Sequence, residues 1–156
     1  MNSGDVFADN NVLSDVAGSL SGDIAYGNVI RILPDKEVRE KYSGRAYIKW
    51  LLLQGKMICH QAMFIKTAVM REYGYNLEYK ITADFNMLCR LVHDKKQFAY
   101  IDRDIVRMDN ITGISTVSSN LPVMWKEDDR SIRKYFPVWY YLLVPIKKVA
   151  RGRKSR

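Results

Sequence analysis

Segments with the composition of β-strands alternate along this chain with segments that have the spacing of α-helices, and this alternation limits the fold more than any other feature. Runs rich in β-branched and aromatic residues predict strands at 23–33, 97–102 and 104–109, with a charged turn between the last two. Apolar spacing and cap residues predict helices at 10–20, 46–54, 67–73, 82–93 and 120–136. The order predicts an α/β fold.

Details of these segments give further expectations. In the helix at 82–93, Thr82 is the expected N-cap, and the apolar face follows the spacing i, i+3, i+4, i+7 through Phe85, Leu88, Cys89 and Val92. In the helix near residue 10, Asp9 or Asn10 is the expected cap, and the buried face is expected to comprise Leu13, Val16, Ala17 and Leu20. The charged, turn-rich stretch 34–44 predicts a mobile loop.

Composition excludes several classes of protein. An apolar content of 47% supports a packed core, and the two cysteines, Cys59 and Cys89, lack the paired spacing of a zinc site and are expected to be buried thiols. No segment has the pattern of a signal peptide, and the longest apolar run, 138–146, is far shorter than the roughly 20 residues that span a bilayer. These features favour a cytoplasmic protein.

Charge is distributed unevenly. Residues 126–156 hold ten Lys or Arg against three Asp or Glu, which gives +7 of the chain's net charge of +8. Residues 138–143, Val-Trp-Tyr-Tyr-Leu-Leu, precede the basic tail, and aromatic residues beside cations are typical of a segment that contacts anionic lipid. A helix that packs on the core and ends in a solvated tail fits equally well. Nucleic-acid binding is disfavoured because the aromatic residues are not interleaved with the basic ones.

Two acidic residues are candidates for chemistry. Asp5 ends an Asn-Ser-Gly-Asp turn, where small residues allow close approach of a ligand and a carboxylate suits Mg²⁺ or Mn²⁺. An ordinary Asx-turn is the alternative. Asp84 lies in the first turn of a predicted helix, where it is either an acid favoured by the helix dipole or a general base.

Other residues are less informative. His60 lies in a largely apolar segment, as a satisfied core or rim histidine or as a contact to phosphate or metal, whereas His93 is expected at the surface. The chain has no nucleophile elbow, no GxGxxG and no phosphate loop of the nucleoside-triphosphatase kind, so these motifs give no support to hydrolase or dinucleotide chemistry.

Five motifs in order give the chain a resemblance to the second half of family 2 glycosyltransferases with the GT-A fold. They are the segments Asn2–Phe7, Asp23–Val29, Ile58–Ile65, Tyr79–Arg90 and Gly113–Ser115. The resemblance covers about residues 1–118. It implies a partial GT-A fold, Rossmann-like with a mixed sheet, that lacks the N-terminal nucleotide-binding half. Residues 1–118 then form the metal- and acceptor-side part of the domain, and residues 119–156 form a C-terminal amphipathic helix and basic tail.

The resemblance also implies an activity. The family transfers a sugar from a nucleotide-diphosphate donor to an acceptor hydroxyl, so the implied cofactor is Mg²⁺ or Mn²⁺ and the implied substrate is a nucleotide sugar. Asp5 matches the last carboxylate of the family's DxD-type motif and is the expected metal ligand, while Ser3 stands where that motif has its first acid. Asp84 matches the acid expected to activate the acceptor hydroxyl, and His60 and Gln61 are expected to line the same cleft.

Two departures from the family qualify these expectations. No strand and nucleotide-binding turn precede Met1, and the Gln-x-x-Arg-Trp signature of processive synthases is absent, which favours transfer of single sugars. The expected role is assembly of cell-surface polysaccharide or lipopolysaccharide on a glycan or lipid-linked acceptor, at the inner face of the membrane. The alternative is a non-catalytic truncated remnant that folds only with a partner chain or as a homo-oligomer through an exposed sheet edge.

Overall fold

The described part of the chain forms an α/β fold around a five-stranded mixed sheet, as the alternation predicts. A computed structural model describes residues 4–42, 45–109 and 118–142. The strands are β1 (Val6–Phe7), β2 (Ile24–Ile32), β3 (Glu37–Glu40), β4 (Met63–Ile65) and β5 (Phe98–Asp109). The path through the sheet is β1-β5-β2-β3, with β4 pairing to β2 as well. The β2–β5 pair is parallel and the other pairs are antiparallel.

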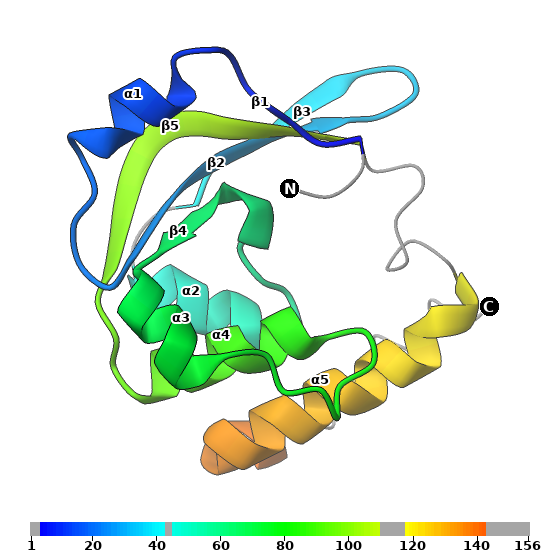
Figure 1. Ribbon diagram of the computed structural model, residues 1–156. Coiled ribbons are helices and arrows are strands. Elements are labelled where there is room, and N and C mark those ends of the chain that lie inside the picture. The colour runs from blue at the N-terminus through cyan, green and yellow to red at the C-terminus, as the bar shows by residue number, and fades with distance from the viewer. Residues whose placement is uncertain (1–3, 43–44, 110–117, 143–156) are drawn as a thin grey trace.

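The helices lie mainly on one side of this sheet (Figure 1). They are α1 (Val12–Ala17), α2 (Arg45–Leu53), α3 (Thr67–Tyr73), α4 (Ala83–His93) and α5 (Leu121–Tyr135), with short 3-10 turns η1 (His60–Ala62) and η3 (Ser118–Asn120). Residues 137–142 continue as helix after α5. α2, α3, α4 and α5 gather together, whereas α1 lies against β5 away from them (Figure 1). In the described parts of the chain, no helix combines the length and apolar character needed to cross a bilayer.

Two predictions about strands were wrong because charged residues were interpreted as turns. Within the stretch 34–44, predicted to be a mobile loop, residues Glu37–Glu40 form β3, which makes a hairpin with β2 in which Arg31 binds Glu40 at 2.6 Å. The charged residues at 103 and 104 do not divide 97–109 into two strands, because Arg103 binds Asp9 of the segment before α1 at 2.7 Å, and Asp104 binds Arg39 at 2.6 Å. Cross-strand ion pairs allow charges inside a strand at a solvated face.

The centre of β2 is irregular for a packing reason. The pairing of β2 with β5 shifts between Tyr26 and Val29, around Gly27 and Asn28. A Cβ on Gly27 would lie 2.5 Å from Ile105 Cγ1, so the side chain of Ile105 takes the space that another residue would need. Asn28 is fully buried, where its amide donates to Asp102 at 3.0 Å and accepts from the Tyr100 hydroxyl at 2.8 Å. The buried amide is therefore satisfied.

The prediction of the buried face was confirmed for α4 and was largely wrong for α1. The four residues predicted for the buried face of α4, Phe85, Leu88, Cys89 and Val92, are all buried. In α1 the buried residues are Val12 and Val16. Leu13 and Ala17 of this helix and Leu20 after it are exposed, so of the four predicted residues only Val16 was correct. The N-cap of α1 is Asn11 rather than Asp9 or Asn10, and Asp9 accepts the Asn11 amide at 2.9 Å.

The core also includes residues near the end of the chain's described part. Ile132 and Phe136 are buried in the main cluster with residues of β2, β5, α2 and α4. The buried Asn86 side chain of α4 donates to the Ser131 hydroxyl of α5 at 3.0 Å. Cys59 and Cys89 are buried thiols, as expected. α5 is therefore packed into the same core as the sheet, and its position is coupled to that of α4.

Candidate functional site

The first part of the site is the turn that leads into β1. Gly4 has φ of 91°, a left-handed conformation that glycine adopts without strain, and Asp5 follows it as a half-buried residue. β1 then pairs with β5, with Val6 opposite Arg107. The sheet thus fixes the Asp5 backbone directly beside an ordered strand. Ser3 lies outside the described residues, so its predicted role remains an expectation.

The second part is η1, which the fold places at the beginning of β4. β4 pairs with β2 through Tyr26 and Met63, so the preceding turn is held against the middle of the sheet. Buried Ala62 anchors η1, and His60 and Gln61 are half-buried neighbours in it. Gln61 Nε2 donates to Asp5 Oδ2 at 2.9 Å, across 56 positions of sequence.

The third part is the first turn of α4. Asp84 Oδ2 lies 3.0 Å from His60 Nδ1, and the two side chains are 24% and 35% exposed. The other oxygen, Oδ1, accepts the backbone amide of Phe85 at 2.8 Å. The carboxylate is therefore held by two contacts yet is open to solvent on one side, so a ligand could reach the pair.

The four described residues predicted for the site thus form two linked pairs. Asp5 contacts Gln61, His60 contacts Asp84, and the two pairs are joined because His60 and Gln61 are consecutive. In Figure 1, β4 lies between β1 and α4, and η1 directly precedes β4 along the chain. The fold brings together residues from three separated motifs. The fifth motif, Gly113–Ser115, lies outside the described residues.

Cys59 supports this arrangement from the buried side. Its thiol donates to Gln61 Oε1 at 2.7 Å and also lies 3.7 Å from Met108 Sδ. Burial raises the pKa of the Cys59 thiol to about 11, so at neutral pH the thiol keeps its proton and remains a donor. With the Gln61 oxygen occupied by Cys59, the amide nitrogen is directed toward Asp5. Sequence patterns gave Cys59 no role beyond a buried thiol.

Glu127 of α5 holds the segment that precedes α4. Its carboxylate accepts the backbone amides of Lys80, Ile81 and Thr82 at 2.8, 3.1 and 2.9 Å, and the Thr82 hydroxyl at 3.2 Å. Partial burial acts to raise the pKa of Glu127, but these hydrogen bonds outweigh it and hold the pKa below its usual value. Thr82 is at the N-cap position as predicted, yet its hydroxyl contacts Glu127 rather than capping the helix.

Sequence reasoning missed Glu127, and no pattern could have identified it, because its partners are backbone amides 45 to 47 positions away. It also missed Tyr75, whose hydroxyl has its pKa raised by burial and by the nearby Asp84 carboxylate. Tyr75 follows Gly74, where α3 ends as predicted, and its side chain is 46% exposed. An exposed aromatic ring near a carboxylate is available to contact a ligand.

His93, by contrast, lies at the surface as predicted. Its side chain is 52% exposed and its Nδ1 lies 2.7 Å from the Asp94 carboxylate. It is at the far end of α4 from Asp84, so it takes no part in the candidate site.

The residues of the site suit a metal ion whose coordination shell is completed by groups of a bound substrate. Within the described residues, no group of three or more His, Cys, Asp or Glu side chains could hold a metal ion by itself. Mg²⁺ in nucleotide-dependent enzymes is often held through one or two carboxylates, with substrate phosphates and water completing its shell. Asp5, a half-buried carboxylate with one amide donor on Oδ2, suits this mode of binding.

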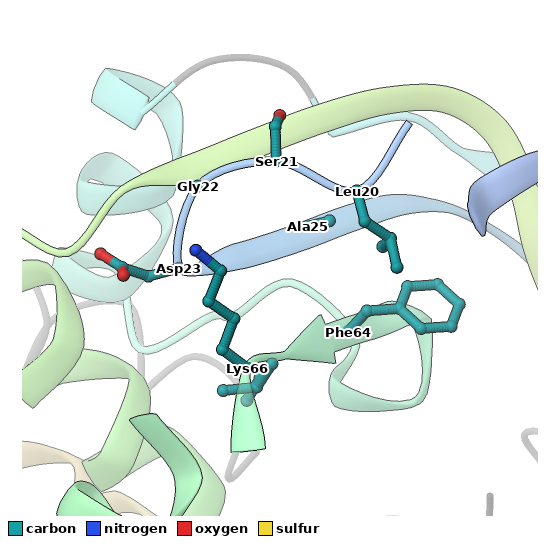
Figure 2. A pocket seen from close by; sticks show the side chains of 8 residues that line it. Leu20, Ser21, Gly22, Asp23, Ala25, Phe64 and Lys66 are labelled. Atoms are coloured by element: carbon teal, nitrogen blue, oxygen red, sulfur yellow. The ribbon is translucent and has the colours of Figure 1, made fainter. Parts of the chain in front are cut away.

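A separate hollow lies at the other end of β4 (Figure 2). It has a volume of about 120 Å³ and is lined mainly by apolar groups, among them Leu20, Ala25 and Phe64, with Lys66 at its side. The carboxylate of Asp23 points away from this side, and its Oδ2 accepts the Gln97 backbone amide at 2.8 Å. The hollow is smaller than the roughly 300 Å³ at which pockets for drug-sized ligands begin. It does not include any of the predicted site residues.

Comparison with known proteins adds no family to this geometry. No protein-family model matches the chain, and a search of curated proteins finds no significant match. The interpretation of the site therefore rests on the contacts among Asp5, His60, Gln61 and Asp84.

Proposed function

We propose that this chain is the metal- and acceptor-side part of a metal-dependent glycosyltransferase of the GT-A, family 2 kind. The reaction would transfer a single sugar from a nucleotide-diphosphate donor to an acceptor hydroxyl in cell-surface polysaccharide or lipopolysaccharide assembly. One observation carries the proposal: residues chosen from separate motifs meet in contact, Gln61 with Asp5 at 2.9 Å and His60 with Asp84 at 3.0 Å.

The chemistry assigned to these residues is a displacement at the anomeric carbon. Asp84 takes the proton of the acceptor hydroxyl as its oxygen bonds to that carbon, and the bond from the carbon to the diphosphate breaks. Asp5 contributes to a Mg²⁺ or Mn²⁺ site, and the ion, when bound, offsets charge on the leaving diphosphate. His60 Nδ1 orients the Asp84 carboxylate, and Gln61 orients Asp5.

Metal-dependent binding tests the first half of the proposal. Mn²⁺ binding to the full chain is measured by electron paramagnetic resonance with and without a nucleoside diphosphate. We expect the diphosphate to strengthen Mn²⁺ binding, Asp5→Ala to remove that gain, and Asp84→Asn to leave it nearly unchanged. Asp35→Ala is the matched control, because Asp35 is an exposed acid in the turn between β2 and β3. Equal binding by the Asp5→Ala variant would refute the metal assignment.

Turnover tests the second half. Transfer or donor hydrolysis is assayed with a panel of nucleotide sugars in the presence of Mn²⁺. Asp84→Asn should remove most turnover, by a factor of about 100 or more for loss of a general base. Asp15→Asn is the control, since Asp15 is also an acid in the first turn of a helix but lies in α1. Full activity in the Asp84→Asn variant would contradict the base assignment.

An alternative function follows from the sheet edge. Among the described residues, β4 pairs with β2 and with no other strand, so its second edge is open to another strand. A non-catalytic remnant that joins a partner chain or a second copy would use this edge. Size-exclusion chromatography with light scattering distinguishes the two functions: stable self-association without metal-dependent diphosphate binding would favour the remnant.

A further inference from the structure

The short helix at residues 137–142 is attached to the core by one of its sides. Phe136, just before it, is 7% exposed within the main hydrophobic cluster, and Tyr140 packs against that cluster. Lys49 of α2 lies over the rings of both Phe136 and Trp139, at 5.7 and 5.6 Å from their centres. The helix therefore has a defined inner side and a fixed orientation.

The outer side of this helix is apolar. Val138, Tyr141 and Leu142 are 69%, 63% and 63% exposed, and Trp139, at the border with the inner side, is 44% exposed although Lys49 lies over its ring. Exposed apolar residues that occur singly need no explanation, but four within five positions form a contiguous patch. A helix that merely completed the core would carry polar residues at these positions.

Beside this patch, α5 presents a row of cations to solvent. Lys126, Arg130, Arg133 and Lys134 follow the helical spacing i, i+4, i+7, i+8, so they share one face of α5. They line an open groove of about 780 Å³ together with Asp129 and Tyr140, which ties the row to the helix at 137–142. Within the described residues, Arg130 is the member of this row that forms a salt bridge, with Glu78.

The sequence of α5 contains nearly equal numbers of acidic and basic residues, but in the structure most of the acids and the cations lie on different sides of the helix. Glu127 faces inward to the backbone amides of 80–82, and Asp128 is buried at 6% exposure. Of the three acids that interrupt the basic residues in the sequence, Asp129 alone lines the groove. The solvent-facing side of α5 is therefore much more positive than its composition indicates.

We propose that this cationic row and the adjoining apolar patch form a binding surface for an anionic lipid bilayer. The aromatic and aliphatic side chains of 138–142 enter the headgroup region, and the cations of α5 meet anionic headgroups. Trp and Tyr concentrate at membrane interfaces because they combine an apolar ring with a polar group. The proposal is independent of glycosyl transfer, and it locates the contact on the folded domain rather than on the basic tail after residue 142.

The charges favour lipid over nucleic acid. Here the apolar residues form one patch and the cations an adjoining row, which suits the layered chemistry of a bilayer surface. A strand of nucleic acid is bound by cations that alternate with aromatic rings along its path. The two surfaces therefore predict different sensitivities to substitution, which an experiment can measure.

The test is co-sedimentation of the full chain with phosphatidylcholine vesicles that contain or lack phosphatidylserine. The K126Q/R133Q/K134Q variant should lose affinity for the anionic vesicles by roughly a hundredfold, since each of the three surface cations contributes about 1 kcal/mol. The V138S/Y141S/L142S variant should bind weakly to both kinds of vesicle. The control K36Q/K66Q/R71Q removes the same charge from other exposed positions and should bind as the parent does.

All substituted residues are exposed, and circular dichroism checks that each variant is folded. Binding that is unchanged in the first two variants would overturn the proposal, because the tail would then account for any attachment to lipid. Failure of the parent chain to bind anionic vesicles would also overturn it. So would tight binding of a single-stranded oligonucleotide that the first variant loses while no vesicle binding is seen.

Discussion

The cluster at η1 and the surface at 126–142 use polar residues in opposite ways. At η1, Asp5, Gln61, His60 and Asp84 are directed toward one another, and each has a partner from a distant part of the chain. At 126–142, cations and apolar side chains are directed outward, and Glu127 is turned away from them. Polar groups that bind one another make one arrangement specific, whereas side chains directed to solvent leave the other available for contact with a large and chemically simple surface.

Glu127 connects the two regions. It is next to Lys126 of the cationic row, yet its carboxylate holds residues 80–82, directly before the helix that carries Asp84. Asn86 and Ser131 form a second connection between α4 and α5. A change in the position of α5 would therefore be transmitted to the start of α4. Substitutions on the inner side of α5 should therefore lower stability more than substitutions on its outer side.

Among the substitutions of polar side chains, the largest effect is expected for Glu127→Ala. The substitution removes the acceptor of three backbone amides and one hydroxyl, and each donor left without a partner costs about 1–3 kcal/mol where water cannot replace it. Because these groups are partly solvated, we expect the free energy of unfolding to fall by about 2–3 kcal/mol in total. Urea denaturation measures this change. Lys126→Ala is the matched control on the outer side, with an expected change within about 0.5 kcal/mol.

The response to acid gives an independent check on Glu127. Its pKa in the folded protein lies below the ordinary glutamate value of 4.5, so its contribution to stability is complete above that pH and is lost as the pH falls through the folded pKa. The parent chain should therefore lose more stability below pH 4.5 than the Glu127→Gln variant does. Equal acid dependence of the two proteins, measured by denaturation at several pH values, would exclude the carboxylate as the stabilising group.

Features of the fold that depend on residues close together in the sequence could be predicted, whereas features that depend on contacts between distant segments could not. The buried face of α4 was predicted correctly because its spacing is local and periodic. β3 and the unbroken β5 were missed because their charges are balanced by partners on other strands, such as Arg39 with Asp104. Ion pairs between strands leave no local pattern, so a sequence reader interprets such charges as turns.

The candidate site shows the same limit. The residues Asp5, His60, Gln61 and Asp84 were chosen by their motifs and the resemblance, but their pairing could not be derived from spacing. The contribution of Cys59 depends on a thiol that meets the Gln61 carbonyl, and the contribution of Glu127 on backbone amides. Sequence therefore indicated which residues to examine, and the fold determined which of them are in contact.

The second prediction concerns the inner connection between α4 and α5. Asn86→Ala leaves the fully buried Ser131 hydroxyl without the Asn86 amide and opens a small cavity. We expect the free energy of unfolding to fall by about 1–2 kcal/mol. In a double-mutant cycle, adding Ser131→Ala should cost less than it does in the parent chain. Strict additivity of the two substitutions would mean that the hydrogen bond contributes nothing to holding α5.

The third prediction concerns the inner cluster itself. Gln61→Glu replaces the amide that donates to Asp5 with a second carboxylate, so two like charges face each other. Without metal, the free energy of unfolding should fall by about 1 kcal/mol, because these groups are partly solvated. Millimolar Mn²⁺ should restore it, since a pair of carboxylates binds a divalent cation better than one does. Thermal denaturation with and without Mn²⁺ measures both effects, and the parent chain under the same two conditions is the control.

The smallest effect on stability is expected on the outer side. Leu142→Ser changes a side chain that is 63% exposed, so little buried apolar area is lost and the free energy of unfolding should change by no more than about 0.5 kcal/mol. Phe136→Ser, six positions earlier in the core, should instead cost at least about 3 kcal/mol. Urea denaturation compares the two. A large loss of stability from Leu142→Ser would mean that the apolar patch is held within the fold, and the contrast between inward and outward residues would then fail. A small loss leaves the exposed apolar side chains without a role in folding, and contact with another surface is the remaining physical reason for them.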